Sequence, residues 1–96
     1  MSYESKLKSA EMDELLKAIL LLETEEEAYR FFDDLCTIKE MKAICQRFQV
    51  ARCLTQQKTY AEIEAQTGAS TATISRVNRS LAYGADGYKV VFERME

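Results

Sequence analysis

The sequence predicts an all-helical protein, and three observations support this prediction. There is no proline and there are only three glycines in 96 residues, so long stretches contain nothing that would interrupt a helix. Within these stretches apolar residues recur every three or four positions instead of alternating, which is typical of amphipathic helices. Threonine and glutamate spaced three residues apart, a helix-start signal, occur at Thr24 and Thr37. The composition, 47% hydrophobic and 30% charged, fits one globular domain over residues 1–96.

The first predicted helix runs from about Leu7 to Leu22. Its apolar side chains cover more of the helix circumference than a single core-facing stripe requires. These side chains are Met12, Leu15, Leu16, Ile19, Leu20 and Leu22. We therefore expect this helix to have partners on two sides.

Two more helices are predicted before residue 58. Thr24 and Glu27 form a capping-box pattern at the start of a short amphipathic helix. Thr37 and Glu40 repeat the pattern at the start of a helix that extends to about Gln57, a length of about 30 Å. The apolar residues of this long helix are Ile38, Met41, Cys45 and Phe48 on one face, followed by Val50, Ala51 and Leu54 on a rotated face. The rotation predicts that the helix makes two contacts in succession.

A helix-turn-helix is predicted at about residues 59–82. A short helix over Thr59–Gln66 is stopped by Gly68, which adopts the left-handed C-cap conformation easily, and Ser70 caps the next helix, which extends to Tyr83. The apolar anchors of this unit are Ile63, Ile74 and Val77. After Gly84, Asp86 is predicted to cap a last short helix. The side chains expected to dock from that helix are Tyr88, Val91, Phe92 and Met95.

The second helix of the predicted helix-turn-helix, which starts after Ser70, has small or basic residues on its outward side. Such a side is suited to a DNA groove. The predicted DNA contacts are Lys58, Thr59, Ser70, Thr71, Ala72, Thr73, Ser75, Arg76 and Arg79. The chain has a net charge of −3, but from Lys42 to Leu81 there are six basic and two acidic residues, a balance suited to phosphates. The two acidic residues, Glu62 and Glu64, lie in the helix that ordinarily crosses the DNA backbone, so either DNA binding is weak or they face away from the groove.

Several other classes of function are not expected from the composition. The absence of histidine removes the commonest general base and the usual nucleophile arrangements, and Asp33 and Asp34 are adjacent on a helix, where they form a solvated face rather than a catalytic pair. Three cysteines without a CxxC spacing predict buried thiols and neither a disulfide framework nor a metal site. No cofactor is indicated. The longest apolar run, Ala18 to Leu22, is too short for a membrane span, so a cytoplasmic protein is expected.

The run from Gly68 to Leu81 resembles the reading head of the tryptophan repressor superfamily. Three other segments, Thr37 to Leu54, Thr59 to Ile63 and Tyr83 to Tyr88, are similar to its YerC/YecD group. The resemblance implies a TrpR-like helical bundle in which two chains interlock as an intertwined homodimer. The apolar excess of the first and third predicted helices agrees with a dimer, because a single chain of this size does not readily bury it.

The resemblance also bears on a small-molecule effector. Arg76 and Ser80 match positions that hold the amino acid in the tryptophan repressor, but Val77 replaces a glycine that leaves room for the indole. Gln46 replaces a second ligand-binding arginine, and Arg47 lies one position off, rotated by about 100° on a helix. The residues of the possible effector pocket are Gln46, Arg47, Val50, Arg76, Val77 and Ser80. An unknown effector is therefore possible on these residues, but L-tryptophan is not expected.

The sequence thus favours a dimeric regulator that binds double-stranded DNA specifically, a repressor by family likeness, at a palindromic operator. The alternative is a protein-interaction module on the same fold with little DNA affinity. Glu62, Glu64 and the net negative charge favour this alternative. An enzyme is the most remote hypothesis.

Overall fold

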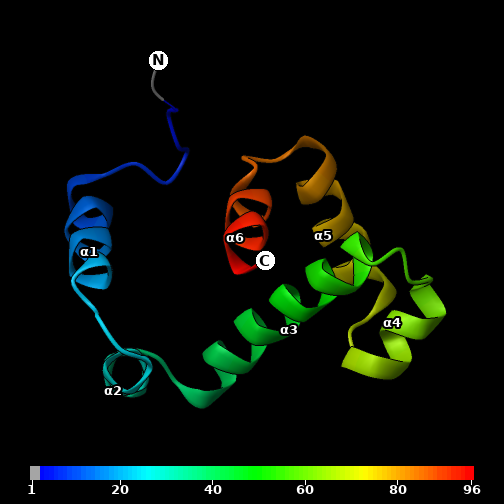
Figure 1. Ribbon diagram of the computed structural model, residues 1–96, viewed down its shortest axis with the longest axis horizontal. Helices are drawn as coiled ribbons and strands as arrows, with labels where there is room; N and C mark the ends of the chain where they lie inside the picture. The colour runs from blue at the N-terminus through cyan, green and yellow to red at the C-terminus, as the bar shows by residue number, and fades with distance from the viewer. Residues whose placement is uncertain (1–2) are drawn as a thin grey trace. The chain divides into compact units, whose positions relative to one another are not determined.

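The computed structural model describes residues 3–96 and contains helices and no strand among them, which confirms the predicted all-helical class. The first two residues of the predicted domain 1–96 lie outside this description. The helices are α1 (Ala10–Leu20), α2 (Glu25–Leu35), α3 (Ile38–Thr55), α4 (Tyr60–Thr67), α5 (Thr71–Tyr83) and α6 (Gly87–Met95) (Figure 1). Contacts between residues divide the chain into two compact units, one ending at Thr37 and the other spanning Ile38–Glu96. Each unit is described separately below.

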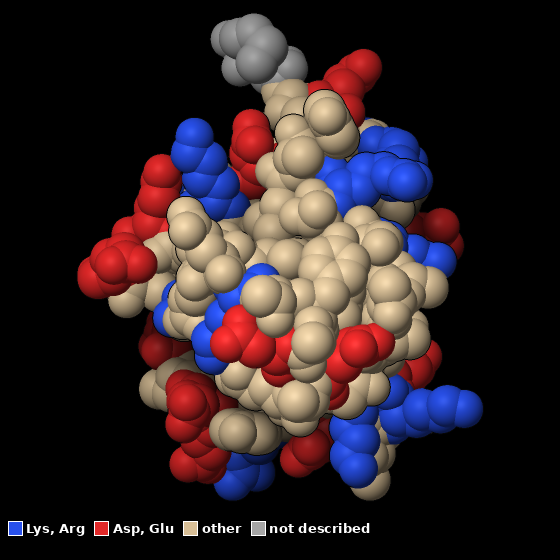
Figure 2. All heavy atoms as spheres, turned by 90° about the vertical axis from the view of Figure 1, so that its right-hand side faces the viewer, with Lys and Arg blue, Asp and Glu red and all other residues tan. Residues whose placement is uncertain are grey.

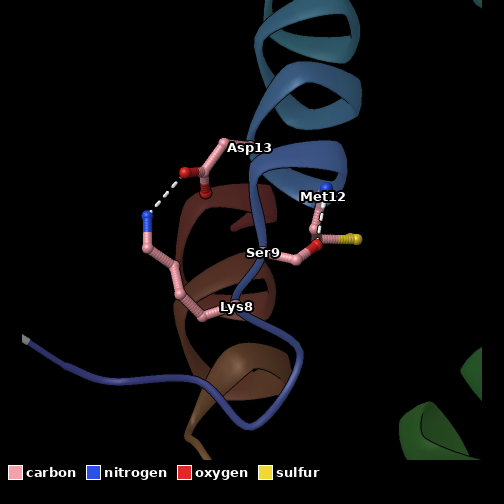
Figure 3. Close-up of polar contacts among 4 residues, drawn as sticks. All are labelled: Lys8, Ser9, Met12 and Asp13. Atoms are coloured by element: carbon pink, nitrogen blue, oxygen red, sulfur yellow. Dashed lines mark hydrogen bonds and ion pairs between the residues drawn. The ribbon is translucent and has the colours of Figure 1, made fainter.

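The start of α1 is fixed by a side-chain cap. The hydroxyl of Ser9 accepts a hydrogen bond from the Met12 backbone N–H at 3.0 Å, and the Lys8 ammonium lies 2.6 Å from the Asp13 carboxylate (Figure 3). A serine cap satisfies one of the helix N–H groups that have no partner within the helix. The prediction that this helix starts at Leu7 was therefore wrong, because the cap places its first residue at Ala10.

The predicted capping box of α2 is only half formed. Thr24 accepts a hydrogen bond from the Glu27 N–H at 3.1 Å, as expected. The Glu27 carboxylate, however, accepts from the N–H of Glu23, one residue before the cap, at 2.8 Å. No residue of α1 or α2 is buried, so the first unit does not enclose a core of its own.

The core lies in the second unit, where α4 and α5 pack against α3 and against each other (Figure 1). The buried side chains are Val50, Ala51, Cys53, Ile63, Ala69, Ile74, Val77 and Phe92. The three predicted anchors of the helix-turn-helix are among them and are confirmed. Three of these eight residues come from the C-terminal half of α3, so this half of the helix forms one side of the core.

The N-terminal half of α3 contributes no buried side chain to this core. Ile38 is 77% exposed and Ile44 is 45% exposed, although both are large apolar residues. The prediction of buried thiols holds for Cys53, whereas Cys36 is half-buried and Cys45 is exposed. The prediction was wrong for Cys45 because that residue lies on the part of α3 that the core does not cover.

Helix α6 is attached by aromatic contacts. The Phe92 ring is buried, with centroid distances of 5.3 Å to Phe48 and 5.9 Å to Tyr88. Docking of Tyr88 and Phe92 is therefore confirmed. Docking of Val91 and Met95 was wrong, since these side chains are 45% and 56% exposed. The ring contacts use one side of α6 only.

The start of α6 differs from the prediction. Asp86 has φ 63°, in the left-handed region, and its side chain makes no capping hydrogen bond. Its backbone carbonyl instead accepts from the Val90 N–H at 3.1 Å. The left-handed backbone, which aspartate tolerates better than most residues, replaces the predicted side-chain cap.

We predict that Gly84 cannot be replaced by alanine without loss of stability. Its N–H donates to the Ser80 carbonyl at 2.9 Å, and an added Cβ would lie 2.3 Å from that oxygen, so the backbone between α5 and α6 would have to shift. Gly84→Ala should lower the free energy of unfolding by about 1–3 kcal/mol in urea titrations at one protein concentration. Gly87→Ala is the matched control, since nothing lies within 4 Å of its added Cβ. Equal midpoints for the two variants would contradict the prediction.

Candidate nucleic-acid interface

The turn between α4 and α5 is fixed by its backbone and by one threonine. Gly68 has φ 74°, and its N–H donates to the Glu64 carbonyl at 2.9 Å, which ends α4 as predicted. The Thr67 hydroxyl donates to the Ile63 carbonyl at 2.7 Å and accepts from the Ala69 N–H at 3.1 Å. Ala69 itself is buried in the core. The polar groups of the turn are thus satisfied while its centre stays packed, which holds the two helices at a fixed angle.

The start of α5 is also capped as predicted. Ser70 accepts from the Thr73 N–H at 3.2 Å and its hydroxyl donates to the Thr73 hydroxyl at 3.1 Å. Its backbone is extended, so the helix begins at Thr71. The cap orders the first turn of α5, which is the part of a helix-turn-helix that meets base edges.

Helix α4 begins with a complete capping box. Thr59 accepts from the Glu62 N–H at 3.2 Å, and the Glu62 carboxylate accepts from the Thr59 N–H at 2.8 Å. Hydrogen bonding of the Glu62 carboxylate to the Thr59 backbone N–H, and in second place to the Thr59 side chain, holds the pKa of Glu62 below its ordinary value. Because the pKa is lowered, the ionised carboxylate stabilises α4 fully at pH values above the ordinary pKa of glutamate. This stabilisation is lost as the pH falls through the lowered pKa.

The predicted DNA contacts on α5 lie on its accessible side, opposite the buried Ile74 and Val77. The exposed members of that set on or next to α5 are Ser70, Thr71, Ala72, Ser75, Arg76 and Arg79, and Thr73 is half-buried. Thr59 is exposed at the start of α4. The half-buried Lys58 donates to the Gln66 side chain at 2.7 Å. Lys58 is therefore held against α4 by a hydrogen bond that the sequence did not indicate.

One acidic residue lies inside this surface. The Glu64 carboxylate accepts a hydrogen bond from the Thr71 hydroxyl at 2.8 Å, which joins the last turn of α4 to the first residue of α5. The alternative in which both acidic residues face away from the groove stays a prediction, and for Glu64 the contact with the first residue of α5 does not favour it. The side of the molecule on which α4 lies carries acidic and basic side chains interspersed (Figure 2). Glu64 and Thr71 are seven residues apart on either side of a tight turn, which brings them together. This spacing is the sequence signal from which the contact could have been predicted.

Two of the predicted effector residues are buried in the core of the second unit. Val50 and Val77 are 0% and 2% exposed, so within one chain they offer no surface to a ligand. The Gln46 amide donates to the Thr67 carbonyl at 3.2 Å. The remaining three, Arg47, Arg76 and Ser80, are exposed.

A surface hollow of about 520 Å³ lies elsewhere, between the C-terminal end of α3 and α6. Its lining residues are Arg52, Thr55, Gln56, Leu81, Lys89, Phe92, Glu93 and Glu96. None of the predicted effector residues is among them. The Arg52 guanidinium lies 5.1 Å from the centre of the Phe92 ring, which places Arg52 beside α6.

Residues 3–96 contain no candidate metal site. In that part of the chain no three acidic or cysteine side chains are grouped so that they could hold a metal ion. No helix described there is both long enough and apolar enough to cross a membrane.

The fold and this site define a helical protein with a capped helix-turn-helix. The chain belongs to the Trp repressor family, since the family model for the Trp repressor protein matches residues 10–96. It is 54% identical over 91 residues to the uncharacterised protein YerC of Bacillus subtilis (strain 168), covering 95% of this chain and 88% of that protein. The resemblance to the YerC group is thereby confirmed. The family consists of helical DNA-binding regulators rather than enzymes.

Two solved structures are similar to this chain. One, from Staphylococcus aureus and described as a candidate Trp repressor, has a TM-score of 0.89 at 57% identity, covering 94% of this chain and 90% of the other. The second, a TrpR-like protein from Eubacterium eligens ATCC 27750, has a TM-score of 0.90 at 57% identity, covering 94% and 93%. The TrpR-like fold is therefore confirmed for this chain.

Proposed function

We propose that this protein is a sequence-specific transcriptional regulator, a repressor by family likeness, that acts in the cytoplasm and binds a palindromic operator as a homodimer. The observation that carries the proposal is the division of α5 into two sides. Ile74 and Val77 are buried, while Thr71, Ser75 and Arg79 are exposed on a helix whose start is capped. Such a helix enters the major groove with small side chains toward the base edges and arginines toward phosphates.

The distribution of charge supports the same role. Residues 38–96 contain nine basic and six acidic side chains, although the whole chain has a net charge of −3. Arg76 and Arg79 lie on the exposed part of α5. Positive charge at the reading helix supplies the sequence-independent share of DNA affinity, which falls as salt rises.

The proposed dimer is supported by apolar side chains that the single chain leaves in water. Seven large apolar residues on or next to α1, α2 and the start of α3 are exposed: Leu16, Leu20, Leu21, Tyr29, Leu35, Ile38 and Ile44. Leu20 is 82% exposed and Leu21 is 77% exposed. Large apolar side chains left this exposed within each unit favour an interface between proteins. A second copy of the chain is the occupant that the TrpR-like family implies.

A second candidate function is favoured by one observation. Glu64 places a carboxylate at the first residue of α5, where it repels phosphate. A protein-interaction module on this fold would tolerate that charge better than a DNA-binding protein. The two functions differ in whether retention on duplex DNA depends on salt.

The first prediction of the proposed function concerns association. We expect sedimentation at micromolar concentration to show a dimer, and we expect the midpoint of thermal unfolding to rise with protein concentration, because folding and association are linked. A compact monomer whose unfolding does not depend on concentration would contradict the proposed homodimer.

The second prediction concerns DNA. Selection from random duplexes should yield a palindrome, and Arg79→Ala should weaken binding to all sequences alike and flatten the salt slope by about one unit, because a phosphate contact is lost. Arg94→Ala, which removes the same charge from the last turn of α6, is the control and should leave the slope unchanged. Absence of salt-dependent retention in the wild-type protein would favour the interaction module.

The third prediction is that L-tryptophan is not the corepressor. The family likeness implies a glycine where Val77 is buried here at 2% exposure, and overpacking by a few methyl groups costs about 1–3 kcal/mol. Gln46 also lacks the charge of an arginine, and a hydrogen bond to a charged group contributes about 1.5–3 kcal/mol. Isothermal titration should show no saturable heat at millimolar L-tryptophan. Micromolar binding that also strengthens operator retention would contradict the prediction.

A further inference from the structure

We infer that Glu64 determines base specificity: together with Thr71 it presents a pair of hydrogen-bond acceptors that selects cytosine at one position of each half-site. The inference rests on the proposed DNA-binding function. It assigns to an acidic residue on α4 a role in reading the sequence, where its charge alone would suggest only a loss of affinity.

The first step is geometric. Glu64 lies in the last turn of α4 and Thr71 is the first residue of α5, and the Thr71 hydroxyl donates to Glu64 Oε2 at 2.8 Å. Both side chains are exposed. Within residues 3–96 no lysine or arginine forms an ion pair with this carboxylate. The carboxylate is therefore held at the start of the reading helix, and its charge is not neutralised there.

The second step is a count of donors. A threonine hydroxyl has one hydrogen to donate and two lone pairs that accept. In Thr71 that hydrogen is directed to Glu64, so only acceptor capacity remains toward a DNA base. An ionised glutamate is also an acceptor only. The two side chains thus offer acceptors and no side-chain donor.

The third step compares this pair with the four bases. In the major groove guanine and thymine present acceptors, adenine presents an acceptor beside its amino group, and cytosine presents only the N4 amino donor. Acceptors facing acceptors leave desolvated polar groups unpaired, so guanine and thymine are rejected and adenine is disfavoured. Cytosine matches the pair, because its one free N4 hydrogen can be accepted by either member and cytosine presents no acceptor of its own to them.

The negative charge strengthens this selection. Repulsion between Glu64 and phosphates lowers affinity for every sequence to a similar extent, whereas the hydrogen bond to cytosine is made only at the correct base. Lower non-specific affinity increases the ratio by which an operator is preferred over bulk DNA.

The test compares bound sequences selected from random duplexes by the wild-type protein, Glu64→Gln and Glu62→Gln. Glu62→Gln is the matched control, because it removes the same charge from the same helix and glutamine is also found at that position of capping boxes. Both variants should bind non-specific DNA more tightly than the wild type. Only Glu64→Gln should relax the cytosine preference, by about five- to a hundredfold in the Kd ratio of cytosine over thymine at that position. Adenine should gain, because a glutamine amide both donates and accepts.

The outcomes separate the inference from the proposed function. If the wild type selects a palindrome and Glu64→Gln selects the same base frequencies at every position, the inference is wrong and the DNA-binding function stands. If the wild type selects no sequence, both are wrong. Thr71→Val and Thr71→Ser provide a second check. Thr71→Val removes the hydroxyl and should weaken the cytosine preference, whereas Thr71→Ser keeps the hydroxyl and should preserve that preference. Equal cytosine preference in these two variants would overturn the role of the pair. Circular dichroism of each variant should be recorded to check that it is folded.

Discussion

The helix-turn-helix depends on apolar contact with the C-terminal half of α3. Val50 and Ala51 are completely buried there, and Ile63 from α4 and Ile74 from α5 complete the same core. Full burial of each large side chain stabilises the fold by about 1.5–3 kcal/mol. The polar bonds of the turn, which involve Thr67, are local and modest by comparison. Helix α5 is thus oriented by packing, while the caps decide where each helix begins.

Local features of the fold could be predicted from the sequence because their determinants lie within a few residues. The left-handed stop at Gly68 and the cap at Ser70 depend on backbone sterics and one hydroxyl each, so their positions follow from residue type. The buried and exposed sides of α5 follow from helical spacing. The contact between Glu64 and Thr71 could not be predicted with the same ease, because it requires the angle between two helices. Asp86 failed as a cap because its backbone took the left-handed conformation instead, which residue type alone does not decide.

The two units differ in how completely they bury their apolar residues. The second unit has a closed core, whereas α1 and α2 contain no buried residue and leave Leu20 and Leu21 largely in water. A helix pair of this kind does not offset the conformational entropy lost on folding. The excess of apolar positions in the α1 sequence indicated that some of these side chains would lack cover within the unit. Periodicity does not say which surface covers them.

The acidic residues of α4 show why charge has to be read together with hydrogen bonding. Glu62 and Glu64 are equivalent in a count of charges and both oppose phosphate. The Glu62 carboxylate caps its own helix through the Thr59 N–H, which lowers its pKa and fixes its direction along α4. The Glu64 carboxylate instead reaches across the turn and accepts the hydrogen of the Thr71 hydroxyl at the start of α5. Of two identical side chains two residues apart, one thus stabilises the scaffold and the other shapes the surface that the scaffold presents.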